Sequence, residues 1–467
     1  MPIVAILIFI SECKNMAPET IYALSTAPGL AGVAVLRVSG SQANTVWEKM
    51  SSHHPSPRIA SLIKLFDPDD RSEIDRCLGL WFPGPASFTG EDVVELHLHG
   101  GRAVVNGAIE ALAKLPGFRP AEAGEFTRRA FNNDKLDLTE VEGLSDLIAA
   151  ETEAQRKQAI RQMDGELSRL IDGWRDRLVR ILAYLEAEID FPDEELEDGI
   201  SEQVKHNIVS LITDVNQHLE DGHRGERLRD GYSIAIVGPP NAGKSSLLNA
   251  LARRDVAIVS DVAGTTRDII EVHLDLSGYP VMLSDTAGLR DLELHTTDGV
   301  ELEGIRRAKS HAESADLLLA VFDIKDYEKL DPSTMDLLVG QDSIILLNKC
   351  DDEDSGTNLL PTLNSETEVL QVSAKTGLGI DKLLNLLNDT VITNMGNIGS
   401  SSGITRQRHR SALQDTTEAL SRALMIELPE LCAEDLRLAT RHLGRITGKV
   451  DVEDLLDVIF RDFCIGK

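Results

Sequence analysis

The sequence predicts a multidomain protein of α/β plus all-α class, with an N-terminal α/β domain and a second, doubly wound α/β domain inserted between two helical segments. The chain has 467 residues and 42% hydrophobic content, so about two to four domains are expected. Short apolar strands alternate with helical sequence over residues 232–373, which predicts a mainly parallel sheet. Amphipathic helical periodicity lies on both sides of that stretch, and the simplest packing joins the two helical segments.

The predicted domain boundaries follow changes in periodicity. The segments are, in chain order, an N-terminal α/β domain, a first helical part, the inserted α/β domain and a second helical part, at residues 17–134, 135–228, 229–395 and 396–467. Helical spacing is clearest over residues 167–185 and 204–219. Residues 394–403 are rich in Gly, Ser and Asn, which is typical of a linker.

Apolar runs give the expected strands. The N-terminal domain has strand-like runs at residues 32–38 and 93–99. Those of the inserted domain are residues 233–238, 269–276, 280–285, 316–323, 343–348 and 369–373.

Charge and cysteine content restrict the function. A formal net charge of −30 argues against a protein that coats nucleic acid, so any RNA contact is expected to be local or supplied by a partner. The cysteines number 5 and form no CxxC pair, which favours a reducing cytoplasm. The apolar run at residues 3–10 is too short to span a bilayer, and the first residues lack the basic character of a signal or transit peptide. We expect a cytoplasmic protein without a membrane partner.

Residues 238–245 read Gly-Pro-Pro-Asn-Ala-Gly-Lys-Ser and match GxxxxGK[ST] between a predicted strand and a predicted helix beginning near Ser246. The glycines let backbone N–H groups surround phosphate oxygens, Lys244 adds a charge, and the Ser245 hydroxyl can ligate magnesium. The candidate nucleotide contacts in this loop are Asn241, Ala242, Gly243, Lys244, Ser245 and Ser246.

Three further motifs follow in the order typical of guanine-nucleotide proteins. They are the groups Asp285, Thr286, Ala287 and Gly288; Asn348, Lys349 and Asp351; and Ser373, Ala374 and Lys375. The first can hold the magnesium shell and contact the outer phosphate. An aspartate after Asn348 can accept both ring N–H donors of guanine, which adenine lacks, so the predicted nucleotide is GTP. Thr266, between these motifs, is the expected second magnesium ligand.

Leu289 follows Gly288, where Ras-type enzymes keep a glutamine that orients the attacking water. Leucine cannot hydrogen-bond water, so either hydrolysis is slow or another group acts. The acidic residues downstream leave the choice open: Asp291, Glu293, Asp298, Glu301 and Glu303.

Together with the last four residues, Cys-Ile-Gly-Lys, these motifs resemble the MnmE (TrmE) family of tRNA-modification GTPases. The resemblance spans almost the whole chain, including residues 32–40, 87–95, 124–128, 133–137 and 190–194. It implies a potassium-dependent GTPase that works with an FAD-containing, MnmG-like partner in a heterotetramer or larger complex. The pair would add an aminomethyl or carboxymethylaminomethyl group to carbon 5 of the tRNA wobble uridine. A tetrahydrofolate derivative, 5-formyl or methylene, would supply the carbon, and the N-terminal domain would bind it and form a homodimer.

The resemblance also implies roles for individual residues. The loop of Ser260, Asp261, Val262, Ala263, Gly264 and Thr265 would contact the nucleotide, and the potassium ligands would be Asn241, Ser260, Val262 and Thr265. Glu301 would orient water. Cys464 would take part in the folate chemistry as nucleophile or acid/base. The folate-binding residues would be Arg37, Glu95, Lys135 and Lys467.

Alternatives remain at two levels. Without the resemblance, Arg37 and Glu95 are more simply solvated strand residues. His97 and His99 share the face of Glu95 and suggest zinc, but no further ligand of suitable spacing is evident. For the whole chain, the rivals are a regulatory GTPase of ribosome assembly that modifies no substrate, and a folate enzyme regulated by an appended GTPase.

Overall fold

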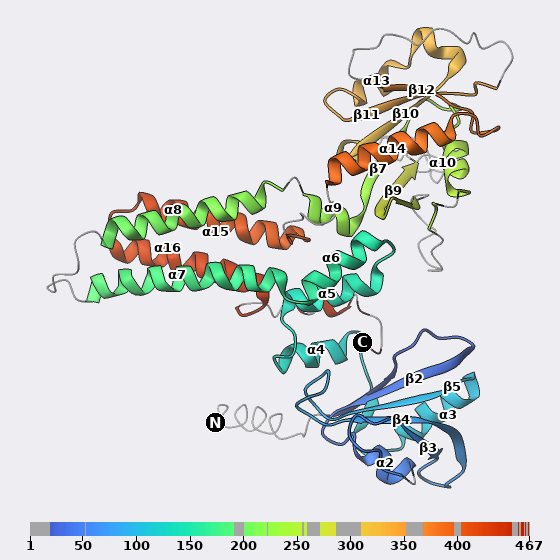
Figure 1. Cartoon of the computed structure of the whole chain (residues 1–467), viewed down its shortest axis with the longest axis vertical. Coiled ribbons are helices and arrows are strands. Elements are labelled where there is room, and N and C mark those ends of the chain that lie inside the picture. The colour runs from blue at the N-terminus through green and yellow to red at the C-terminus, as the bar shows by residue number, and fades with distance from the viewer. Residues whose placement is uncertain are drawn as a thin grey trace, which may run out of the picture. The chain divides into compact units, whose positions relative to one another are not determined.

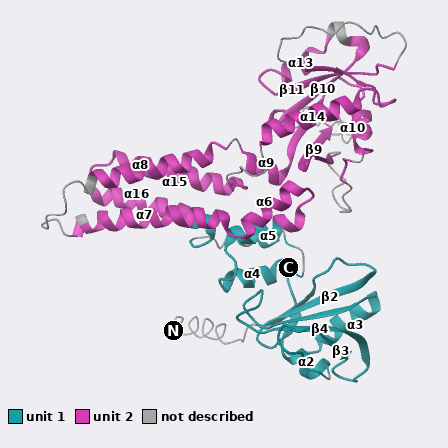
Figure 2. Ribbon diagram, viewed as in Figure 1, with its two compact units in different colours: residues 1–145, 444–467 teal, residues 146–443 magenta. Residues whose placement is uncertain are grey.

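The computed structural model describes most of the chain. The described residues are 19–51, 53–190, 200–221, 223–254, 256–258, 271–285, 310–351, 368–396, 403–450, 456, 459–461, 463 and 466. Two compact units emerge from the internal contacts (Figure 2): residues 1–145 with 444–467, and residues 146–443. No helix among the described residues has the length and apolar composition needed to cross a bilayer.

A six-stranded sheet forms the centre of the first unit, in the order β3-β4-β5-β2-β1-β6. The strands are β1 (Thr20–Leu24), β2 (Ala31–Ser39), β3 (Ser61–Phe66), β4 (Glu73–Phe82), β5 (Val93–Gly100) and β6 (Phe118–Pro120). Neighbouring strands are antiparallel except for the parallel pair β1 and β6. Helices α2 (Thr45–Met50) and α3 (Arg102–Ala113) contribute to one core with the sheet, in which Leu36, Leu96 and Leu112 are fully buried.

Residues from the far end of the chain complete this unit. Leu138 and Val141, from α5 (Leu138–Ala149), share an apolar cluster with Leu456, Phe460 and Phe463. The preceding helix, α4 (Glu125–Asn132), has Gly124 as its N-cap at φ +67°. An added Cβ there would come within 2.5 Å of the Phe460 carbonyl oxygen, so only glycine permits this close approach.

In the second unit, long helices run alongside one another (Figure 1): α7 (Glu166–Asp190), α8 (Ile200–Leu219), α15 (Gln407–Met425) and α16 (Pro429–Thr447). The unit also contains the shorter helices α6 (Glu153–Met163) and α9 (Arg224–Asp230). Helix α8 contacts both α7 and α15, which lie on opposite sides of the second sheet in the sequence. Arg410 of α15, only 4% exposed, donates to Asp221, to Glu226 and to the Leu219 carbonyl.

The second sheet has the order β12-β11-β10-β7-β9-β8. Its strands are β7 (Tyr232–Val237), β8 (Glu271–Leu276), β9 (Tyr279–Asp285), β10 (Leu317–Asp323), β11 (Ser343–Asn348) and β12 (Glu368–Gln371). All described neighbours are parallel except β8 and β9. Side chains of β7 alternate between two cores, as a strand buried on both faces requires: Ile234 and Ile236 in one, Ala235 and Val237 in the other.

Helices cover both faces of this sheet. They include α10 (Lys244–Ala252), α13 (Pro332–Leu337), α14 (Ile380–Met395) and the 3₁₀-helix η1 (Ile324–Lys329). The strand and helix predictions are confirmed where these elements are described, with two local differences. Helix α10 begins at Lys244 rather than Ser246. Helix α14 continues to Met395, inside the predicted linker, because Met395 is buried in the core beneath the helix.

Candidate functional site

The loop between β7 and α10 holds its shape through two glycines. Gly238 has φ +146°, and a Cβ there would lie 2.2 Å from the Val321 carbonyl oxygen. Gly243, the N-cap of α10, has φ +93°, and a Cβ there would lie 2.3 Å from Asn348 Nδ2. Side chains are excluded at both positions, so the backbone of the loop and the N-terminus of α10 can approach an anion closely.

Lys244 is buried beneath this loop. Its Nζ donates to the carbonyl oxygens of Gly238, at 2.9 Å, and Pro239, at 3.0 Å. Both of these acceptors are neutral carbonyl oxygens, and they hold the ammonium group at the loop, where its positive charge can attract phosphate oxygens.

Ser245 and Asp285 meet at the carboxyl edge of the sheet. The Ser245 hydroxyl donates to Asp285 Oδ2 at 2.6 Å, and Asp285 is fully buried at the end of β9. Two hard oxygen donors of this kind suit Mg²⁺, which is usually held by few protein ligands plus phosphate oxygens. The pair predicted from two separate motifs is therefore brought together, and it fits the expected metal.

Asn348 ties the phosphate loop to the next part of the site. Its Nδ2 donates to the Ala242 carbonyl at 2.8 Å, and its Oδ1 accepts from the Ala374 N–H at 3.1 Å. The Asn348 side chain is only 2% exposed, so its amide makes the hydrogen bonds that water would otherwise make to these two backbone groups. The side chain thereby fixes the distance between the phosphate loop and the Ser373–Lys375 loop.

Asp323 is a site residue that the sequence analysis missed, and its contact with Lys349 identifies it. Lys349 Nζ donates to the Asn241 carbonyl at 2.7 Å and to Asp323 Oδ2 at 2.8 Å. Burial tends to raise the pKa of Asp323, but hydrogen bonds from Lys349 and from the Lys325 N–H outweigh it and hold the pKa below its usual range. The available signal was the position of Asp323 at the end of a strand, on the edge that the motifs share.

Asp351 is oriented by Ser373. The Ser373 hydroxyl donates to Asp351 Oδ1 at 2.7 Å, and Lys375 Nζ lies 3.7 Å from Oδ2. The hydrogen bond from Ser373 is the main cause that lowers the pKa of Asp351, so the carboxylate stays ionised. An ionised acceptor on a fixed loop has the chemistry needed to bind the two N–H donors of guanine.

Several predicted site residues lie outside the described residues. They are Ser260, Asp261, Val262, Ala263, Gly264, Thr265, Thr266, Thr286, Ala287, Gly288, Glu301, Cys464 and Lys467, together with Leu289 and the other acidic candidates downstream of it. Their roles stay predictions. One neighbour is described: Ser284, just before Asp285, shares a 2.6 Å hydrogen bond with His311 Nε2.

A second cluster of polar groups lies on the sheet of the first unit. Arg37 and Glu95 face each other across β2 and β5, with Arg37 Nε donating to Glu95 Oε1 at 3.0 Å. The Arg37 guanidinium also lies over the rings of Phe88, at 5.6 Å, and Phe126, at 5.8 Å. Both charged residues are partly buried, so they form a paired, aromatic-lined patch rather than freely solvated side chains.

Two further features border this patch. Lys135 lies beside Gly90, where an added Cβ would be 3.2 Å from the Lys135 Cε. Gly466 accepts a hydrogen bond from the Ser25 hydroxyl at 2.9 Å, and a Cβ there would lie 2.3 Å from the Leu24 carbonyl oxygen. Leu24 pairs with Leu36 and Ala23 with Arg37, so Gly466 lies beside a strand that is paired with the one carrying Arg37.

The two histidines near Glu95 have separate partners. His97 Nε2 lies 3.4 Å from Glu95 Oε2, whereas His99 Nδ1 lies 2.8 Å from Asp75 Oδ1. Over the described ranges, no group of three or more His, Cys, Asp or Glu side chains is arranged to hold a metal.

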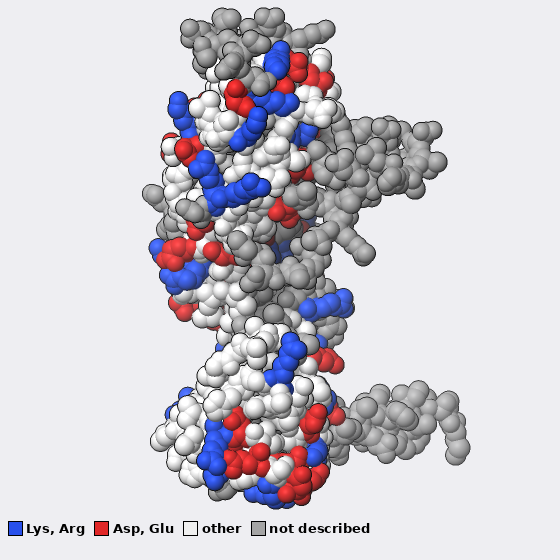
Figure 3. Space-filling view, turned by 90° about the vertical axis from the view of Figure 1, so that its right-hand side faces the viewer, with Lys and Arg blue, Asp and Glu red and all other residues white. Residues whose placement is uncertain are grey.

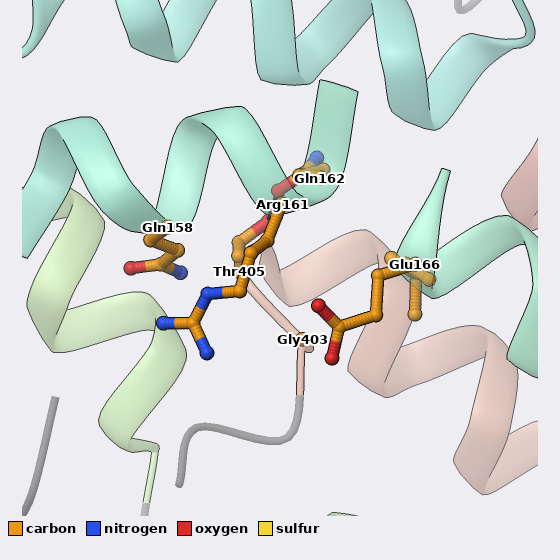
Figure 4. A pocket seen from close by; sticks show the side chains of 7 residues that line it. Gln158, Arg161, Gln162, Glu166, Gly403 and Thr405 are labelled. Atoms are coloured by element: carbon orange, nitrogen blue, oxygen red, sulfur yellow. Dashed lines mark hydrogen bonds between the residues drawn. The ribbon is translucent and has the colours of Figure 1, made fainter. Parts of the chain in front are cut away.

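Other surfaces and cavities contribute little to these sites. A cavity of about 20 Å³, lined by Gln158, Arg161, Gln162, Glu166, Leu167, Gly403 and Thr405 (Figure 4), has room for about one water and includes no nucleotide-motif residue. On the face in Figure 3, basic and acidic side chains are interspersed over the described surface.

The glycine-bounded loop, the buried Lys244, the pair of Ser245 and Asp285 and the oriented Asp351 define a P-loop protein with a guanine-nucleotide site. Residues 20–135 match the family described as "GTP-binding protein TrmE N-terminus", and residues 138–464 match "MnmE helical domain". The chain belongs to the MnmE (TrmE) family, and it is a GTPase.

Curated relatives agree over nearly the full length. The "tRNA modification GTPase MnmE" of Parvibaculum lavamentivorans is 52% identical over 96% of this chain and 100% of its own. The "5-taurinomethyluridine-[tRNA] synthase subunit GTPB3, mitochondrial" of Danio rerio is 50% identical over 96% of this chain and 93% of its own. Its Homo sapiens counterpart is 47% identical with the same two coverages.

Proposed function

We propose that the chain is a potassium-dependent GTPase that acts with an MnmG-like, FAD-containing partner to modify carbon 5 of the tRNA wobble uridine. The modification is an aminomethyl or carboxymethylaminomethyl group built from a folate one-carbon unit. The observation that carries the proposal is identity of about half of all positions, over nearly full length, to proteins named for tRNA modification. The uridine in the name of the Danio rerio relative supports the same substrate.

In the proposed hydrolytic site, Lys244 and the backbone N–H groups of its loop bind the phosphates, and Asp351 selects guanine. Ser245 and Thr266 are the magnesium ligands, and a bound magnesium ion neutralises phosphate charge. Glu301 orients the attacking water, because Leu289 cannot. Oxygens of Asn241, Ser260, Val262 and Thr265 hold potassium, which supplies the positive charge that other GTPases take from an arginine.

In the proposed folate site, Arg37 and Lys135 attract the glutamate carboxylates and Glu95 accepts from the pterin ring. The paired Arg37 and Glu95, the nearby rings of Phe88 and Phe126, and the placement of Gly466 beside Leu24 support this assignment. Cys464 and Lys467, two residues before and one after Gly466, are proposed to reach the same site. We place folate binding and homodimer formation in this N-terminal domain, in the cytoplasm.

The proposal is tested by nucleoside mass spectrometry of bulk tRNA from a strain that lacks the gene. We expect the hypermodified wobble uridine to disappear, and to return with the wild-type chain and with Arg102→Ala, which changes an exposed arginine of the same domain. Lys244→Ala and Arg37→Ala should not restore it. If the deletion strain keeps an unchanged nucleoside profile and the purified chain hydrolyses GTP, a regulatory GTPase without a modified substrate is favoured instead.

Two kinetic measurements test the hydrolytic site separately. Hydrolysis should be faster in potassium chloride than in sodium chloride at equal ionic strength, and equal rates would remove the proposed potassium site. Glu301→Ala should lower turnover with little loss of GTP affinity. If Glu303→Ala has that effect and Glu301→Ala does not, the water-orienting role belongs to Glu303.

A further inference from the structure

The hairpin of β8 and β9 lies between the two segments expected to sense the nucleotide. Strand β8 begins directly after residues 259–270, and β9 ends at Asp285, directly before Thr286. The two strands pair antiparallel along their whole length, and their turn residues, Ser277 and Gly278, have φ +53° and +88°. Such a tight turn matches the strand twist and makes the hairpin stiff. A displacement at the turn is therefore carried to Asp285.

The N-terminus of α6 binds the turn end of this hairpin. The Ala154 N–H donates to the Gly278 carbonyl at 3.1 Å, and the fully buried Ala154 side chain belongs to the core that contains Leu274 and Tyr279. Just before the helix, Glu151 Oε2 lies 3.0 Å from His273 Nδ1 of β8. A capping box of Thr152 and Gln155 fixes the start of α6, so these contacts come from a rigid element.

His273 also connects to the chain before the first sensing segment. Its carbonyl accepts from the Ile258 N–H at 2.8 Å, and the Asp275 N–H donates to the Val256 carbonyl at 2.8 Å. Residues 256–258 thus lie against β8, and residue 259 begins the segment that contains Thr265 and Thr266. Glu151 and Ile258 therefore contact the same residue: Glu151 bonds the ring of His273, and Ile258 bonds its carbonyl oxygen.

Helix α6 also contacts the chain that leads into the phosphate loop, and it has space beside it. Gln155 Nε2 donates to the carbonyl of Arg229, at the end of α9 and just before β7. A cavity of about 120 Å³ lies there, lined by Asp146, Ala149, Gln155, Gln158, Ala159, Arg229 and Asp230. Gln158 Oε1 is buried and has no hydrogen-bond partner in the described part of the chain. Incomplete packing on this side leaves α6 room to shift, which a close-packed interior would resist.

We propose that Glu151 and His273 are positioning residues for GTP hydrolysis. The hydrogen bond between their side chains and the hydrogen bond from Ala154 to Gly278 clamp the β8–β9 hairpin to α6. The clamp sets where β9 presents Asp285, which in turn holds Ser245. Because coupling between sites is reciprocal, the nucleotide at that edge and the helices attached to α6 then bias one another through the clamp.

A double-mutant cycle on the full-length chain tests the clamp. Glu151→Ala and His273→Ala, which remove the contact altogether, should each lower kcat for GTP hydrolysis about two- to fivefold, the range that a partly exposed polar side-chain contact supplies, with KM and the melting temperature nearly unchanged. The double variant should lose no more than either single variant, because both remove one interaction. Arg156→Ala, which breaks an exposed pair with Glu153 on the same helix, is the matched control and should keep the wild-type rate.

Unchanged kcat in both single variants, or losses that multiply in the double variant, would overturn the proposal. Hydrogen exchange adds a second test, because a merely structural contact would give the same amide protection in both nucleotide states. Protection of the Ala154 amide should differ between the GDP-bound chain and the chain bound to a non-hydrolysable GTP analogue, and equal protection contradicts the coupling. The proposal rests on GTP hydrolysis by this chain. A normal wild-type rate in the same assay therefore shows that a negative result refutes the clamp and not the hydrolytic activity.

Discussion

Replacing Asp351 by Asn should change the base that the chain selects. Asparagine has the same shape, and its Oδ1 can still accept the 2.7 Å hydrogen bond from Ser373, so the loop should keep its conformation. However, the other carboxylate oxygen, Oδ2, is replaced by an amide N–H₂ group. This new donor then faces an N–H donor of guanine. A hydrogen bond to a charged group contributes about 1.5–3 kcal/mol, and the unpaired donors add a further penalty. We expect GTP affinity to fall about 10²- to 10³-fold, because each 1.4 kcal/mol is about tenfold.

Xanthosine triphosphate provides the complementary measurement. Its carbonyl at the position of the guanine amine accepts from the new asparagine, so Asp351→Asn should bind it more tightly than GTP. Calorimetric titration of GTP, xanthosine triphosphate and ATP measures all three affinities. Asp381→Asn, at an exposed carboxylate of α14 paired with Arg254, is the control and should keep the wild-type order. If Asp351→Asn binds GTP within about threefold of the wild type, Asp351 does not recognise the base.

Three further predictions concern stability, thiol reactivity and pH. Arg410→Ala should lower the free energy of unfolding by about 3–5 kcal/mol, because it leaves Asp221 and Glu226 without their buried partner. Arg422→Ala, at a half-exposed pair with Asp435, should lower it by at most about 1 kcal/mol. Denaturant titration measures both, and equal shifts would contradict the difference in burial. Burial raises the pKa of Cys77 to about 12, so native protein at about pH 8 should resist alkylation there until it unfolds, as peptide mass spectrometry can show. The lowered pKa of Asp351 keeps its carboxylate ionised above the usual value of about 4, and the contribution to binding is lost only as pH falls through the lowered value. The ratio of GDP affinity to ADP affinity, in which the titration of the terminal phosphate near pH 6 cancels, should therefore be flat from about pH 8 to 5. A titrating loss of this ratio near about pH 6 would assign base recognition to another group.

Local patterns in the sequence predicted the edge of the second sheet well. The apolar runs that end at Asp285, Asn348 and Ser373 mark parallel strands, and parallel strands place the residues after their carboxyl ends together. The contacts of Ser245 with Asp285 and of Asn348 with Ala242 follow from that rule. Glycine positions were equally readable, because GxxxxGK[ST] states where side chains are excluded.

Contacts between distant segments were not readable in this way. Arg410 and Asp221 are 189 positions apart and belong to helices whose periodicity shows only which face is buried, not which partner covers it. Glu151 and His273 belong to a loop and a strand with no motif in common. The same reason explains why Asp323 was missed: an aspartate that ends a strand is common, and its partner Lys349 identifies it only in three dimensions.

The contact between Ser25 and Gly466 bears on how the protein is made. The two residues are 441 positions apart, so a ribosome that adds about 5–20 residues per second synthesises the second partner about 20–90 s after the first. During that interval the first unit lacks the packing of Phe460 and Phe463 on Leu138 and Val141, and the contact of Gly466 with the end of β1. The first and last strands of its sheet can pair early, but the unit matures only after residues 456–466 have been synthesised. Ribosome stalling or early termination beyond residue 443 would therefore release a second unit with all its residues and a first unit that is incomplete.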